Sequence, residues 1–190
     1  MDVQLPKFVA SFCPIDLVAV VVELLLPARS GNLRPMSAPE SAQPVGDAEF
    51  LRQFENHTLP FAQWHHREHL KVAYLYLRRL PLAAACDRMR AGVKSYNAAH
   101  QVPEAPDRGY HDTLTVAWLR LIHMTICEYG PEETADAFLD KHPQLTQKKA
   151  LRLFYSPALM MSAHAKAEFV EPDLAPLPRS TKPGPNLVAS

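Results

Sequence analysis

The chain is poor in cysteine and has no excess of either charge, and each shortage excludes a class of protein. Its three cysteines, Cys13, Cys86 and Cys127, are widely spaced and form no Cys-x-x-Cys pair. An odd number of distant thiols predicts reduced cysteines in a cytoplasmic protein, and neither a disulfide scaffold nor a zinc knuckle. Twenty basic residues balance twenty acidic ones. No positive field therefore favours nucleic acid as a partner.

Long hydrophobic runs and several catalytic motifs are also missing. The most apolar run, Ile15 to Leu26, contains Asp16 and Glu23 and is shorter than the roughly 20 residues that a membrane span needs. It has too little positive charge before it to be a typical signal peptide. There is no glycine-rich phosphate loop, no Gly-x-Ser-x-Gly elbow, no His-Glu-x-x-His and no Glu-x-x-His, which argues against the enzyme classes that these motifs mark.

Glycine is scarce as well, with six residues against eighteen prolines. The prolines cluster towards both ends of the chain, and this predicts three regions. Residues 1–45 are expected to be a poorly structured N-terminal extension, with Met36 as the natural start of translation. Residues 46–178 are expected to form one helical domain, and residues 179–190 a disordered tail.

Between the proline clusters the sequence has the pattern of an all-α protein. Apolar residues recur at steps of three and four, and no segment shows strand alternation between turn dipeptides. Asp47 is expected to cap the first helix, and Gly130 and Pro131 to separate two later ones. The result is a single-domain bundle of about six helices with an extended, proline-rich C-terminal tail. The expected helices are 48–57, Trp64–Arg79, Leu82–Ala99, Tyr110–Tyr129, Pro131–His142 and Thr146–Tyr155.

Three of the nine histidines stand in the short stretch WHHREHL, at the start of the second expected helix. On a helix His66 and His69 share the apolar face, and His65 lies at its edge. The positive end of the helix dipole keeps an imidazole neutral, and neutral imidazole is the form that binds metal. These rings are therefore either metal ligands or structural groups that satisfy the helix end, with His65 able to join or replace His66.

A third candidate ligand comes from the stretch GYHDT at the start of the fourth expected helix. There His111 is expected to look into the bundle, so that His66, His69 and His111 would form a three-histidine metal site with an open position. Asp112 could be a further ligand, could orient an imidazole, or could simply favour the helix dipole. Tyr110 could donate its hydroxyl to a substrate, or its ring could be packed in the core.

The two stretches resemble a group of small uncharacterised bacterial helical proteins with the motifs W-x-H-x-x-H-L and G-Y-H-E-T. The resemblance covers roughly residues 50–178 and selects His66, His69 and His111, while Asp112 stands where the group has glutamate. It implies no activity. A looser analogy links the chain to DinB-like metal-binding bundles, in which the isolated histidine precedes the pair instead of following it.

Together these patterns predict a metal-dependent enzyme that acts on a small-molecule substrate. The cofactor would be a divalent metal ion, zinc or iron, at His66, His69 and His111, with Asp112 and Tyr110 as catalytic candidates. Hydrolase, transferase and oxidoreductase chemistry all stay open. The alternative is a non-catalytic helical protein–protein interaction module with structural histidines.

Overall fold

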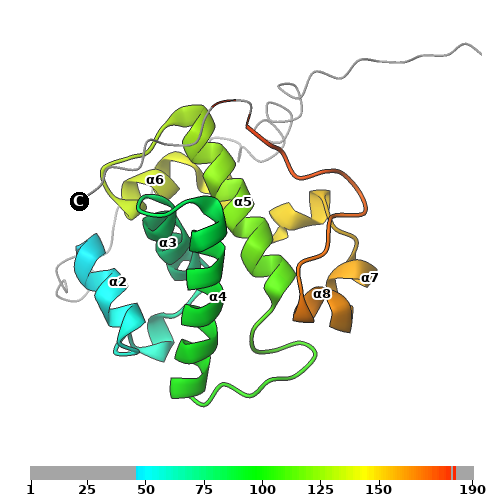
Figure 1. Ribbon diagram of the computed structural model, residues 1–190, viewed down its shortest axis with the longest axis horizontal. Helices are drawn as coiled ribbons and strands as arrows, with labels where there is room; N and C mark the ends of the chain where they lie inside the picture. Colours follow the sequence, from blue (N-terminus) through cyan, green and yellow to red (C-terminus); the bar gives the residue numbers. More distant parts are fainter. Residues whose placement is uncertain (1–45, 181, 183–190) are drawn as a thin grey trace, which may run out of the picture. The chain divides into compact units, whose positions relative to one another are not determined.

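The computed structural model describes residues 46–180 and residue 182, all of which fall in one structural unit. Within this part of the chain every regular element is a helix, which confirms the all-α prediction (Figure 1). The elements are α2 (Asp47–Glu55), η1 (Phe61–Gln63), α3 (His66–Leu77), α4 (Leu82–Ala99), α5 (Asp112–Tyr129), α6 (Ala135–Lys141), η2 (Pro143–Thr146), η3 (Lys148–Leu153), α7 (Pro157–Met160) and α8 (Ala163–Ala167).

Helix α3 lies at the centre of the bundle and packs against α2, α4, α5 and α6 (Figure 1). Its second half is apolar all round, and every residue from Val72 to Leu77 is buried. A helix that is apolar on all sides needs neighbours on all sides. The first turn of α3 is polar instead and carries His66 and His69.

Large tyrosines occupy the core without leaving their hydroxyls unpaired. Tyr74 donates to the carbonyl of Glu132 at 2.6 Å, Tyr96 to that of Leu59 at 2.7 Å and Tyr155 to that of Val170 at 3.1 Å. Each ring buries apolar surface while its hydroxyl binds a carbonyl from a distant part of the chain.

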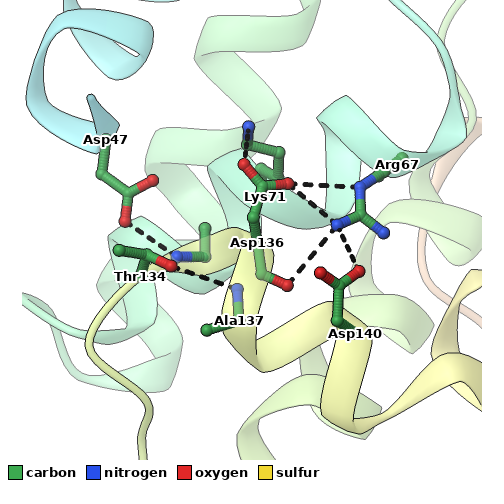
Figure 2. Close-up of polar contacts among 8 residues, drawn as sticks. Asp47, Arg67, Lys71, Thr134, Asp136, Ala137 and Asp140 are labelled. Atoms are coloured by element: carbon green, nitrogen blue, oxygen red, sulfur yellow. Dashed lines mark hydrogen bonds and ion pairs between the residues drawn. The ribbon is translucent and has the colours of Figure 1, made fainter. Parts of the chain in front are cut away.

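A cluster of ion pairs joins helix α3 to α6 (Figure 2). Arg67 Nη2 lies 2.9 Å from Asp136 Oδ1 and 2.8 Å from Asp140 Oδ1, and Lys71 Nζ lies 2.7 Å from Asp136 Oδ2. The amphipathic pattern predicts that Arg67 and Lys71 face water. That expectation is wrong for Lys71, whose side chain is only 12% exposed.

Four helix starts differ from those expected. Helix α3 begins at His66 and not at Trp64, and α5 begins at Asp112 and not at Tyr110. Asp47 is the first residue of α2 and not its cap; its carboxylate accepts from the backbone N–H of Ala135 at 2.8 Å. Helix α6 begins at Ala135 and not at Pro131, because Thr134 caps it by accepting from Ala137 N–H at 3.1 Å (Figure 2). A side-chain cap fixes a helix start more strongly than a proline merely permits one.

The expected helix Thr146–Tyr155 is wrong. That stretch forms two short 3₁₀ segments, η2 and η3, separated by Gln147, whose φ of −81° and ψ of 99° are extended. Leu145, Ala150 and Leu151 are nevertheless buried, so the apolar spacing reports burial and not α-helix. The short helices α7 and α8 follow, and the sequence pattern did not predict them.

The proline-rich tail runs extended along the helices, as expected (Figure 1). Thr113 Oγ1 donates to the carbonyl of Glu168 at 3.0 Å and accepts from the N–H of Val170 at 3.1 Å. Leu177 is buried against the core. The expectations for residues 1–45, for Met36 and for most of 179–190 lie outside the described residues. Among those that are described, no helix is both long and apolar enough to cross a membrane.

Candidate functional site

Four of the nine histidines line one cavity of about 390 Å³ between the first turn of α3, the middle of α4 and the start of α5. We call it the histidine pocket. Its size falls at the lower end of the range for small-molecule sites. The lining residues are Phe61, Trp64, His65, His66, His69, Leu70, Ala73, Met89, Val93, Asn97, Val102, Gly109, Tyr110, His111, Leu114, Thr115, Trp118 and Lys148.

His66 is the first residue of α3 and is partly buried. Burial lowers its pKa; the adjacent backbone of Leu145 acts in the opposite direction, and the charge of Lys148 lowers the pKa further. Its ring meets that of Trp118 edge-on, with centroids 4.8 Å apart. Its Nε2 atom is buried without a hydrogen-bond partner. A neutral imidazole with a free buried nitrogen is an uncompensated cost in the protein alone.

His69 lies one turn further along α3. Burial, with smaller contributions from His66 and Lys148, lowers its pKa to about 3. Its ring lies against that of Trp64 with centroids 3.9 Å apart. His69 is therefore unprotonated at neutral pH, in the state that accepts a hydrogen bond or binds a metal ion.

His65 precedes α3 and is exposed at the edge of the same pocket. Its backbone N–H donates to Glu68 at 3.2 Å, which is one half of a capping box. The structure thus brings His65, His66 and His69 to one cavity, with His65 at its outer edge.

His111 caps α5 and is not within its first turn. Its Nδ1 accepts from the N–H of Leu114 at 3.3 Å, and its Nε2 lies 2.9 Å from the carbonyl oxygen of Met160, to which it donates. Both ring nitrogens are therefore engaged. His111 lines the pocket but offers no free nitrogen in this conformation.

The chain turns into α5 through Gly109, whose φ is +85°. A Cβ there would collide with the carboxylate of Glu104, and that carboxylate accepts from the N–H of Tyr110 at 2.8 Å. Glycine is needed because the backbone is left-handed and crowded at the same point. This turn sets Tyr110 and His111 against the pocket.

Tyr110 and Asp112, the catalytic candidates, are bonded to each other, and Asp112 also binds Arg90. The Tyr110 hydroxyl donates to Asp112 Oδ1 at 2.6 Å, and Arg90 donates to both carboxylate oxygens at 2.8 Å and 3.1 Å. Burial alone would raise the pKa of Asp112, but the bonds from Arg90 and Tyr110 outweigh it and keep the pKa low. Asp112 does not line the pocket, and the Tyr110 hydroxyl already has an acceptor. Their catalytic role stays a prediction.

Within residues 46–180 and 182, no three histidine, cysteine, aspartate or glutamate side chains are grouped closely enough to hold a metal ion. His66, His69 and His111 therefore line one pocket, but among the described residues they do not form a group that could hold a metal ion. Both ring nitrogens of His111 are instead bonded to the backbone of Met160 and Leu114. Metal binding by His66, His69 and His111 stays a prediction.

Sequence reasoning missed the side chains that give the pocket its walls and its charge. Trp64 and Trp118 form two walls, and Lys148 supplies a cation. Trp64 stands two residues before His66, so its place beside the histidines could have been predicted. Lys148 falls in the expected helix Thr146–Tyr155, and nothing in the sequence links it to residues about eighty positions earlier. Asn97 also lines the pocket.

Most of the other described histidines have structural contacts of their own. His57 bonds Ser95 at 2.8 Å, His100 lies against Tyr96 with centroids 4.3 Å apart, and His164 pairs with Glu168 at 3.0 Å. Comparison of the chain with protein-family models, with curated proteins and with solved structures found no match. The resemblance to the small bacterial helical proteins stays a prediction as well.

Proposed function

We propose that the protein is a metal-dependent enzyme that acts on a small molecule in the histidine pocket. One observation supports this above the others: His66 and His69 from α3 and His111 from the start of α5 line the same cavity. The metal ligands that the sequence suggests come from two helices that are separate in the chain. A shared cavity is the first requirement for a site built from them.

The three histidines are not equally available to a metal ion. His66 has a buried Nε2 without a partner, and His69 has a pKa of about 3, so both rings suit a divalent cation without losing a proton. His111 must first exchange its bonds with Met160 and Leu114. In the proposal His66 and His69 are the available ligands, and His111 joins them after release.

A bound divalent ion, zinc or iron, would supply Lewis-acid chemistry or, for iron, redox chemistry. The chain itself supplies the rest. Trp64 and Trp118 exclude water from the walls, and Lys148 holds positive charge at the edge. Tyr110 and Asp112 act as positioning residues, since their bonds to each other and to Arg90 fix the wall beside His111.

Elemental analysis of protein purified without an affinity tag tests the proposal. The expected result is close to one metal ion per chain, lost in His66→Gln and in His69→Gln. His164→Gln is the matched control, because His164 is exposed and outside the pocket, and it should keep the metal. A chelator should lower the melting temperature of the wild type and of this control only.

His111→Gln then separates two forms of the site. Loss of metal places His111 among the ligands, whereas retention restricts the site to α3. A chain that carries no metal and ignores the chelator would contradict the proposal. The capping role of His111 favours the alternative in that event, a helical interaction module whose histidines stabilise the fold.

A further inference from the structure

The histidine pocket carries positive charge and no negative charge. Among the described residues that line it there is one lysine, Lys148, and no aspartate, glutamate or arginine. Lys148 is exposed, and none of the ion pairs formed within residues 46–180 and 182 includes it. Exposed lysines are often solvated, so this charge by itself identifies no ligand.

The helix ends at the pocket add to the positive potential. His66 begins α3, and His111 caps the eighteen-residue helix α5. Each helix start is equivalent to about half a positive charge. Asp112, in the first turn of α5, is neutralised by Arg90, and Glu68 binds the backbone N–H of His65.

Two buried polar atoms of the lining residues lack partners. Trp64 is only 8% exposed, and its Nε1–H has no acceptor; neither has Nε2 of His66 any partner. An unpartnered buried donor is unfavourable, but Trp64 Nε1 is enclosed by the protein and not presented to the cavity, so Lys148 is the cation that a ligand there would meet.

The remaining walls are apolar. The rings of Trp64 and Trp118 stand against His69 and His66 respectively, and Met89, Val93 and Leu114 complete the lining. Such walls take a hydrophobic body. A single lysine without arginine suits one negative charge better than a phosphate dianion, which needs more donors.

We propose that the histidine pocket binds a small organic carboxylate with an aromatic or branched aliphatic body. The carboxylate lies beside Lys148, and the body packs against the apolar walls of the cavity. The inference rests on the proposed function in that it names the substrate class for the same cavity. It does not require the metal.

Intrinsic fluorescence provides a direct test, because the only two tryptophans of the chain both line the pocket. The full-length chain is titrated with phenylacetate and 4-methylpentanoate, and in parallel with the two corresponding amides. Each amide matches its acid in shape but has no charge. At least one acid should change the emission and bind about ten-fold more tightly than its amide, because a charge-assisted hydrogen bond is stronger than a neutral one.

Lys148→Gln supplies the decisive variant. It should weaken binding of the acid several-fold and leave binding of the amide unchanged. Lys149→Gln is its matched control, because Lys149 is the next residue, equally exposed, and outside the pocket; it should change neither. Equal binding of acid and amide, no effect of Lys148→Gln, or no change of emission with any of the four probes would each overturn the proposal.

The same titration after treatment with chelator separates the two proposals. Acid binding that depends on Lys148, in a chain that held no metal before the chelator was added, supports the carboxylate site and refutes the metal enzyme. A chain that holds metal through His66 and His69 but shows no preference for the acid supports the enzyme and refutes the carboxylate site.

Discussion

The two sides of the first turns of α3 differ in whether their polar side chains have partners. Towards α6, Arg67 and Lys71 are bound by the carboxylates of Asp136 and Asp140, and no charge is left over (Figure 2). On the side of the histidine pocket, His66 Nε2 has no partner. Buried polar groups are nearly always satisfied in native proteins. The paired side stabilises the contact between α3 and α6, and on the other side the proposed function assigns a ligand to His66.

The largest effect is expected at Asp112 of α5, a buried carboxylate that has its partner in Arg90. Asp112→Ala removes a carboxylate that is 6% exposed and leaves Arg90 and Tyr110 without their acceptor. The free energy of unfolding should fall by about 3 kcal/mol in urea denaturation, since one partner of a buried ion pair is lost.

Asp87→Ala is the control, because Asp87 binds the same Arg90 from an exposed position, and it should cost less than about 0.5 kcal/mol. If both variants cost the same, Asp112 does not belong to the groups that hold the fold, and the positioning role proposed for it would be contradicted.

The sequence predicted the paired side of the molecule less well than the core. The expected helix from Leu82 to about Ala99 agrees with α4, because its apolar spacing is regular and Pro81 precedes it. Arg67 and Lys71 were assigned to water, since helical periodicity shows which face is polar but not which helix lies opposite. The acids of α6 that bind them are some seventy residues away in sequence.

The candidate site was predicted in part. Spacing alone placed His66 and His69 on one face, and the structure brings them and His111 to one cavity. The sequence could not show that His111 would cap a helix, because a histidine at a helix start can either be a cap or point inward. Nor could it show Lys148, which reaches the pocket from a 3₁₀ segment that was expected to be α-helix.

The next largest effect concerns the dependence of stability on pH. The pKa of His69 is about 3 in the folded protein against 6.5 ordinarily, so the unfolded chain binds the proton first as the pH falls. The contribution to stability is complete above pH 6.5 and is lost progressively towards pH 3.

Between pH 7 and 5, with chelator present, the free energy of unfolding of the wild type should drop by about 2 kcal/mol more than that of His69→Gln. His164→Gln should follow the wild type, because its ring is exposed. Parallel curves for wild type and His69→Gln would show that His69 is not held neutral, and the contrast between the two sides of α3 would weaken.

A smaller effect is expected for the ion pairs between α3 and α6. Asp136 is half-exposed and binds both Arg67 and Lys71. Asp136→Asn should cost about 1 kcal/mol at low ionic strength and less in high salt, because exposed pairs are screened. Asp140→Asn removes one contact of a more exposed carboxylate and should cost less. A salt-independent loss would mean that Asp136 acts through packing or through its neutral hydrogen bonds.

Lys148 should show the smallest effect on stability and the clearest contrast with Lys71. Because no described carboxylate pairs with it, Lys148→Gln should leave the free energy of unfolding unchanged within error. Its charge lowers the pKa of His66, so the same variant should raise that pKa, measured by NMR titration of the imidazole, while Lys149→Gln leaves it in place. Loss of stability in Lys148→Gln would instead place this lysine with Arg67 and Lys71 among the groups that hold the fold, and the difference between the two sides of α3 would disappear.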